Sequence, residues 1–118
     1  MIFVIDDDEI MRGCIVRACG EGAKVREFGD AMAAMAAIAE GVVPELVFLD
    51  ILLDGPDGFT FLNEMVSYTD TARVPIVVVS SLDLGGRDLS VYGVVGVLEK
   101  EKMRPQEVLA YVKQYVGE

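Results

Sequence analysis

The stretch "FVIDDDEI", residues 3–10, joins an apolar run to four consecutive acidic side chains. The apolar letters predict a buried strand at Ile2–Asp6. Carboxylates crowded at a strand end repel one another, by about 1 kcal/mol per pair at 4 Å in water and about 4 kcal/mol at an effective dielectric near 20. We therefore expect some feature of the fold to offset this repulsion.

Composition limits the classes of protein that the chain can belong to. Its 118 residues, 53% of them hydrophobic, predict a single domain over residues 1–118. No apolar stretch is long enough to span a membrane and no basic leader precedes the first strand, so we expect a cytoplasmic protein without a membrane partner. Histidine is absent, which excludes catalytic triads, histidine metal sites and a histidine phosphocarrier. A net charge of −10 argues against direct binding of nucleic acid.

The two cysteines fit neither a disulfide nor a metal site. Cys14 and Cys19 lie five residues apart on a predicted helix and therefore point in different directions. We interpret both as thiols of the hydrophobic core.

Short apolar strands alternate with helical patterns along the whole chain, which predicts an α/β fold with a parallel sheet covered on both faces. The residues 82–92 are the weak point, because Gly85-Gly86 falls where a helix should begin, so that element should be short or irregular. We interpret "MAAMAAIA" as an alanine-rich helix that packs closely on the sheet. The predicted strands are Ile2–Asp6, Lys24–Phe28, Leu46–Asp50, Pro75–Ser80 and Val94–Glu99, and the predicted helices are Glu9–Cys19, Ala31–Glu40, Phe59–Tyr68 and Pro105–Val116.

Polar residues stand at the carboxyl ends of four of these strands, where open parallel sheets bind ligands. Asp6-Asp7 and Asp50 offer the oxygen ligands that Mg²⁺ prefers, and a metal ion would offset the repulsion among them. A carboxylate can also act as a nucleophile toward phosphorus. Ser80 is the candidate hydroxyl and Lys100 the candidate cation for the transferred group.

The sequence resembles the receiver domain of two-component response regulators over essentially its whole length. The resemblance rests on "VIDDDEIMR", "VFLDILLDGPDG", "PIVVVSS" and "GVVGVLEK", and on the eight-residue step from Asp50 to Gly58. It implies a flavodoxin-like, doubly wound five-stranded sheet of order 2-1-3-4-5. It also implies a signalling domain and not an enzyme, phosphorylated by a histidine kinase or a histidine phosphotransfer protein.

The resemblance assigns roles to individual residues. Asp6, Asp7, Asp50 and the backbone carbonyl of Leu52 would hold Mg²⁺, and Asp50 would be the phosphoacceptor. Ser80 and Lys100 would meet the phosphoryl group. The output surface, for an effector domain or a homodimer, would be the face formed by the segment 82–92, the strand 94–99 and the helix 105–116.

Four departures from the family pattern lead to further expectations. Glu101 replaces the proline that commonly follows the lysine, which favours a trans bond and leaves Lys102 as a partial substitute for Lys100. Val97 stands where many relatives carry an aromatic side chain, which excludes an aromatic readout. Leu52 and Leu82 cannot orient an attacking water, so we expect slow self-dephosphorylation.

Two alternative functions stay open at this point. One is a pseudo-receiver that binds partners without being phosphorylated. The other is a small phosphohydrolase of the haloacid dehalogenase type, with Asp6 as nucleophile and Asp8 as acid/base. Ile10 and the short chain argue against the hydrolase.

Overall fold

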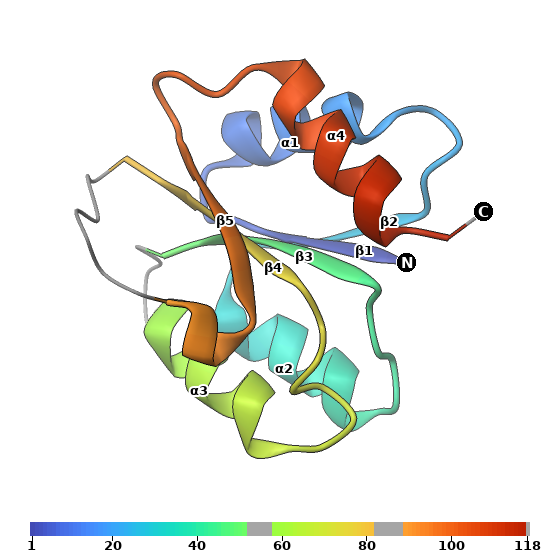
Figure 1. The fold of residues 1–118 in the computed structure, drawn as a ribbon, viewed down its shortest axis with the longest axis vertical. Coiled ribbons are helices and arrows are strands. Elements are labelled where there is room, and N and C mark those ends of the chain that lie inside the picture. Colours follow the sequence, from blue (N-terminus) through green and yellow to red (C-terminus); the bar gives the residue numbers. More distant parts are fainter. Residues whose placement is uncertain (52–57, 82–88, 118) are drawn as a thin grey trace.

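A five-stranded parallel sheet of order β2-β1-β3-β4-β5 runs through the middle of the molecule, with helices on both faces (Figure 1). The structure, a computed structural model, describes residues 1–51, 58–81 and 89–117. Its strands are β1 (Ile2–Ile5), β2 (Val25–Phe28), β3 (Leu46–Asp50), β4 (Ile76–Ser80) and β5 (Val94–Glu99). Its helices are α1 (Glu9–Cys19), α2 (Ala31–Ala39), α3 (Gly58–Ser67), the 3-10 turn η1 (Ser90–Tyr92) and α4 (Pro105–Tyr115). The predicted fold class and strand order are confirmed.

The burial of each strand follows from its place in the sheet. The three inner strands, β1, β3 and β4, are buried at every residue, as their nearly continuous apolar sequences predict. The outer strands β2 and β5 mix exposed and buried residues. A β-bulge at Val95 interrupts the pairing of β4 with β5, since Ile76 pairs with Val94 and Val77 with Gly96.

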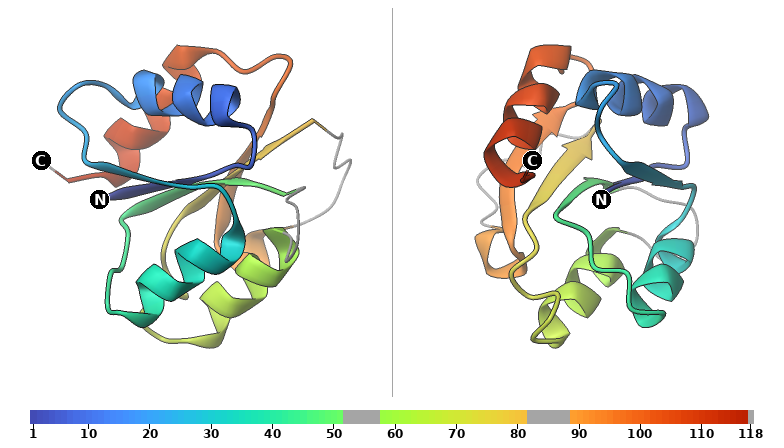
Figure 2. Two further views of the ribbon diagram at one scale, coloured as in Figure 1. Left: turned by 180° about the vertical axis from the view of Figure 1, so that it is seen from behind. Right: turned by 90° about the vertical axis from the view of Figure 1, so that its right-hand side faces the viewer.

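The sheet separates two hydrophobic cores, one under each pair of helices. Figure 2 shows α1 and α4 together on one side of the strands and α2 and α3 together on the other. Alternate side chains of one strand supply the two cores. In β1, Phe3 and Ile5 pack on the α2/α3 side, and Ile2 and Val4 pack on the α1/α4 side.

Local signals in the sequence account for the helix ends. The Asp30 carboxylate accepts a hydrogen bond from the Ala33 N–H at 2.7 Å and so caps α2. Asp8 caps α1 in the same way, at 3.0 Å from the Ile10 N–H. Pro105 occupies the first turn of α4. Asp57, which the sequence suggests as a cap for the helix that follows β3, and the pair Gly85-Gly86 lie outside the described residues.

Two further expectations have different outcomes. The segment 82–92 was expected to hold a short or irregular element. Its described part contains η1, three residues of 3-10 helix. The interpretation of both cysteines as core thiols is wrong for Cys14, which is exposed, whereas Cys19 is buried. Their different directions on α1 put only Cys19 against the sheet.

Within the described ranges, every helix is too short or too polar to cross a lipid bilayer.

Candidate functional site

The register of the sheet brings the polar strand ends together. Ile5 pairs with Leu49, so Asp6 follows β1 at the level where Asp50 ends β3. Asp50 in turn pairs with Val79, and Ser80 is the next residue of β4. Ser80 then pairs with Glu99, and its carbonyl accepts a hydrogen bond from the Lys100 N–H at 2.9 Å. Four strands therefore deliver their last residues to one edge of the sheet.

Three of the predicted carboxylates form one cluster. One oxygen from each of Asp6, Asp7 and Asp50 lies within 4.8 Å of the others. Asp6 and Asp50 are buried, whereas Asp7 is exposed. The cluster therefore has two carboxylates fixed by the sheet and a third at its solvent side.

Lys100 is the cation of the site. Its Nζ lies 2.9 Å from Oδ2 of Asp50 and 3.2 Å from Oδ2 of Asp6, and its side chain is only 15% exposed. No peptide bond among the described residues is cis. The bond between Lys100 and Glu101 is therefore trans, as expected, and the Lys100 side chain still contacts both carboxylates. Lys102 does not substitute for it: its side chain is 81% exposed and pairs with Glu99.

The charges of the site influence one another. Burial raises the pKa of Asp6, and the neighbouring charge of Asp50 adds to the effect, although the hydrogen bond from Asp8 and the charge of Lys100 oppose it. Burial acts to lower the pKa of Lys100, but its hydrogen bond to Asp50 and the charges of both carboxylates outweigh burial and raise that pKa. The lysine therefore stays charged, while its charge and the Asp8 hydrogen bond offset only part of the cost of burying Asp6.

The donor set suits a hard divalent cation such as Mg²⁺. Among the buried side-chain polar atoms of the described residues, Oδ2 of Asp6 makes no hydrogen bond, although it forms an ion pair with the Lys100 amine at 3.2 Å. Its Oδ1 accepts the Asp8 N–H at 2.8 Å, so Oδ2 is the atom left for a ligand. An octahedral cation with few carboxylates and several waters fits two buried acids and one exposed acid.

One supporting residue, Arg12, was not predicted from the sequence. Arg12 of α1 donates from Nη1 to the carbonyl of Asp6 at 2.7 Å and from Nε to Oε1 of Glu27 at 3.1 Å, and so ties the end of β1 to β2. Its only signal was a position one helical turn after Asp8.

Gly58 was noted in the sequence only for its spacing from Asp50. A Cβ at Gly58 would lie 2.7 Å from Cα of Ile51 and 2.9 Å from the carbonyl oxygen of Asp50. The first turn of α3 thus packs directly on the backbone that carries Asp50.

Ser80 is fully buried at the end of β4. Leu52, whose carbonyl was expected to be a metal ligand, lies outside the described residues, as does Leu82. Val97 is exposed on β5, and no aromatic side chain stands at its position.

The family model described as "Response regulator receiver domain" matches residues 2–113. A protein-glutamate methylesterase/protein-glutamine glutaminase of Agrobacterium fabrum is 36% identical over 92 residues, which cover 75% of this chain and 25% of that protein. A second protein of that description, from Oleidesulfovibrio alaskensis, is 25% identical and covers 92% of this chain and 31% of its own length. Among solved structures, the receiver domain of NtrX from Brucella abortus is 26% identical, with a TM-score of 0.77 and 98% of each chain covered.

The chain spans less than a third of the length of these curated relatives, 31% of one and 25% of the other. The likeness therefore concerns only one part of those proteins.

Proposed function

Because this chain belongs to the family of response regulator receiver domains, we propose that Asp50 accepts a phosphoryl group from a phosphohistidine of a kinase or phosphotransfer protein. One observation carries the proposal: the carboxylates of Asp6, Asp7 and Asp50 gather within 4.8 Å, and the Lys100 amine lies 2.9 Å from Asp50. We propose that residues 1–118 act as a single signalling domain without turnover of an external substrate.

The reaction is a transfer between two nucleophiles. An Asp50 oxygen attacks phosphorus and forms an acyl phosphate, while the bond between phosphorus and the imidazole nitrogen of the donor breaks. The imidazole keeps the electron pair and is protonated from solvent. Lys100 is held by Asp6 and Asp50 at the place where charge develops on the phosphoryl oxygens.

Asp6, Asp7 and Asp50 would hold Mg²⁺, which supplies charge stabilisation to the phosphoryl oxygens when it is bound. The orphaned Oδ2 of Asp6 supports this assignment. The Leu52 carbonyl is proposed as a further ligand on the family pattern alone.

Phosphorylation would then switch the surface of the domain. The new group carries about −1.5 to −2 charges in place of the single charge of Asp50, so the Ser80 hydroxyl and the Lys100 amine are drawn to it. Lys100 directly follows β5, and the response would reach the face made by residues 82–92, β5 and α4. We propose this face as the surface for an effector domain or a second copy.

The test is intact-mass measurement after incubation with acetyl phosphate and Mg²⁺. The wild-type chain gains one phosphoryl mass, and both Asp50→Asn and EDTA abolish the gain. Lys102→Ala is the matched control for Lys100→Ala, because its side chain is exposed outside the cluster, and only Lys100→Ala slows labelling. Failure of the wild-type chain to gain mass with either small phosphodonor or a phosphorylated kinase would indicate a pseudo-receiver.

Turnover of a phosphate ester tests the hydrolase alternative. Asp8, its expected acid/base, caps α1 through hydrogen bonds from the Ile10 and Met11 N–H groups. We expect no Mg²⁺-dependent turnover of p-nitrophenyl phosphate. Turnover that Asp6→Asn removes and Asp50→Asn leaves intact would overturn the receiver assignment.

Slow loss of the phosphoryl group is proposed from the sequence. Leu52 and Leu82 carry no group that can hydrogen-bond an attacking water. Replacing them together, Leu52→Asn with Leu82→Glu, should speed the decay of the phosphorylated mass. An unchanged decay rate would refute the role of these positions.

A further inference from the structure

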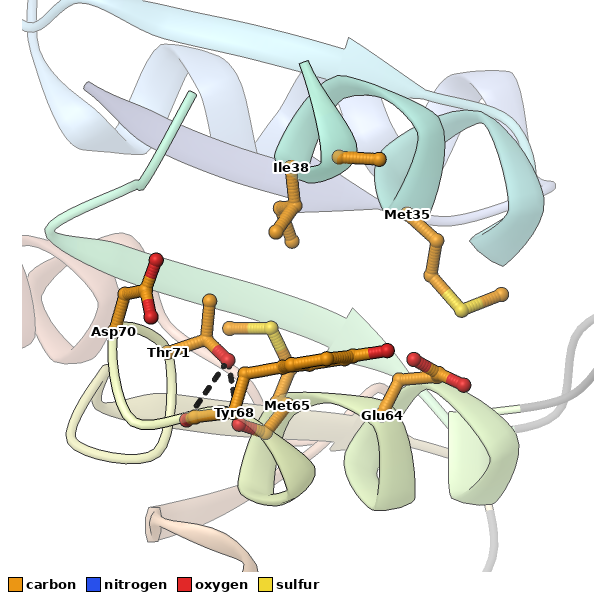
Figure 3. Close-up of a pocket in the computed structure, with 8 residues that line it drawn as sticks. Met35, Ile38, Glu64, Met65, Tyr68, Asp70 and Thr71 are labelled. Atoms are coloured by element: carbon orange, nitrogen blue, oxygen red, sulfur yellow. Dashed lines mark hydrogen bonds between the residues drawn. The ribbon is translucent and has the colours of Figure 1, made fainter. Parts of the chain in front are cut away.

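A groove between α2 and α3 lies away from the acidic cluster. It has a volume of about 360 Å³ and is lined on the α2 side by Met35 and Ile38 and on the α3 side by Met65 and Tyr68. Figure 3 shows these side chains facing one another across the gap between the two helices. Both helices start near the carboxyl ends of the strands, and the groove lies along their later turns, so it is separate from the site of Asp50.

The outer surface of α2 continues this groove. No residue of α2, Ala31–Ala39, carries a polar side chain. Ala31, Ala34 and Ala37 are buried, but Met32 is 61% exposed, and Tyr68 at the end of α3 is 59% exposed. A helix that is apolar on every side normally has protein around it, which α2 lacks on its outer face in this chain.

The rim of the groove is acidic. Glu64 and Asp70 belong to its lining, and none of the described lining residues is basic. A second copy of this chain would bring the same carboxylates together, and each copy carries a net charge of −10. Charge complementarity therefore favours a basic partner over self-association.

The shape selects a helix as the occupant. A groove between two helices accepts an amphipathic helix through anchors spaced three or four residues apart. The nine residues of α2 extend for about 13 Å, enough for two such anchors. Two methionines and a tyrosine line the groove, and methionine adapts its shape to different apolar partners.

We propose that the α2/α3 groove binds a partner protein through an amphipathic helix that carries lysine or arginine beside its apolar stripe. The apolar stripe lies against Met35, Ile38, Met65 and Tyr68. The basic residues lie over Glu64 and Asp70. This surface does not depend on phosphorylation of Asp50.

The six methionines of the chain provide reporters for the test. In protein labelled with ¹³C at the methionine methyls, Met35 and Met65 report on the groove, whereas Met11 and Met103 pack against the α1/α4 core and serve as internal controls. The probe is a leucine–lysine amphipathic peptide of about 14 residues, long enough to form a helix. A leucine–glutamate peptide with the same apolar stripe is its control.

We expect the lysine peptide to shift the Met35 and Met65 methyl signals saturably and to leave those of Met11 and Met103 unchanged. The dissociation constant of the glutamate peptide should be higher than that of the lysine peptide by up to about tenfold. The double variant Glu64→Lys/Asp70→Lys should reverse this preference, and Tyr68→Ala should weaken both peptides.

Several results would overturn the proposal. These are no shift at millimolar peptide, equal binding of the two peptides, or shifts confined to Met11 and Met103. Shifts of Met35 and Met65 that follow protein concentration without peptide would show that a second copy covers the groove.

Discussion

At the scale of single residues, Asp6 is a carboxylate whose burial opposes its charge. It is fully buried, its Oδ2 makes no hydrogen bond, and burial raises its pKa. Lys100 must serve both Asp6 and Asp50. The burial of this charged carboxylate therefore opposes folding.

Neutralising this residue should stabilise the metal-free protein. Asp6→Asn keeps an oxygen for the Asp8 N–H and removes a buried charge, so we expect the free energy of unfolding in EDTA to rise by about 1–2 kcal/mol. Urea denaturation measures the change. Asp7→Asn, at an exposed position, should change it by no more than about 0.5 kcal/mol. A less stable Asp6→Asn protein would show that Lys100 fully compensates the charge of Asp6.

The two thiols of α1 should react very differently. Burial raises the pKa of Cys19 to about 11, whereas Cys14 is exposed. Iodoacetamide at pH 8 should therefore add one group to the native protein, at Cys14, and two to the protein in urea. Intact mass and peptide mapping identify the site. Rapid labelling of native Cys19 would show that α1 opens readily.

The same thiol makes stability depend on pH at the alkaline end. The folded-state pKa of Cys19 lies above its ordinary value of 9.0, so the unfolded chain loses this proton first as the pH rises. The contribution of Cys19 is complete below pH 9.0 and is lost as the pH approaches about 11. Cys19→Ala should show a shallower decline over this range in urea denaturation.

At the scale of secondary structure, the first residue of α3 packs on the backbone at the end of β3, beside the phosphoacceptor candidate Asp50. Gly58 begins α3 and its N–H donates to the Ile51 carbonyl at 3.1 Å. The helix can approach this closely only because position 58 has no Cβ.

Gly58→Ala should therefore destabilise the fold by about 1–3 kcal/mol, because the new methyl meets backbone atoms that cannot move independently. It should also slow labelling of Asp50 by acetyl phosphate. Gly13→Ala is the control, since its methyl meets only the end of the Arg17 side chain at 3.4 Å and position 13 lies inside α1. That change should stabilise the protein by about 0.5–1 kcal/mol. Equal effects at both positions would contradict the argument.

The elements that the sequence predicted well are those whose environment is uniform. β1, β3 and β4 are buried on both faces, so their apolar letters identify them directly. The cluster of Asp6 and Asp50 was predictable because parallel strands end together. The contacts of Arg12 depend on side-chain conformation across two strands, which periodicity does not encode.

The alanine-rich helix shows the other limit of sequence reading. The prediction that it packs on the sheet is correct for Ala31, Ala34 and Ala37. The exposure of Met32 could not be predicted, because every residue of this helix is apolar. A helix without polar residues has no sequence pattern that shows which of its faces is buried.

At the scale of the whole molecule, the excess of negative charge produces long-range repulsion between acidic side chains. A net charge of −10 is confined to a body of 34 × 31 × 24 Å. At 0.01 M salt the screening length is about 30 Å, which spans the molecule, and at 1 M it is about 3 Å. Repulsion is therefore felt across the entire folded chain at low salt and is much weaker in the expanded unfolded chain.

Sodium chloride should accordingly stabilise the protein in EDTA, by about 1 kcal/mol or several degrees in Tm between 0.01 and 0.5 M. Calorimetry follows the transition. The variant Glu21→Gln/Glu101→Gln, which neutralises two exposed acids, should show a smaller rise. A Tm that is insensitive to salt in both proteins would mean that local ion pairs already balance the net charge.

The position of the Lys100 amine has a consequence for the stability of the acidic cluster. It is a counterion that the chain itself supplies to two buried aspartates, Asp6 and Asp50. We therefore expect the chain to fold without a divalent cation, in contrast to proteins that unfold when their metal is removed. If the cluster binds Mg²⁺ as proposed, its occupancy should follow the magnesium concentration while the fold stays intact.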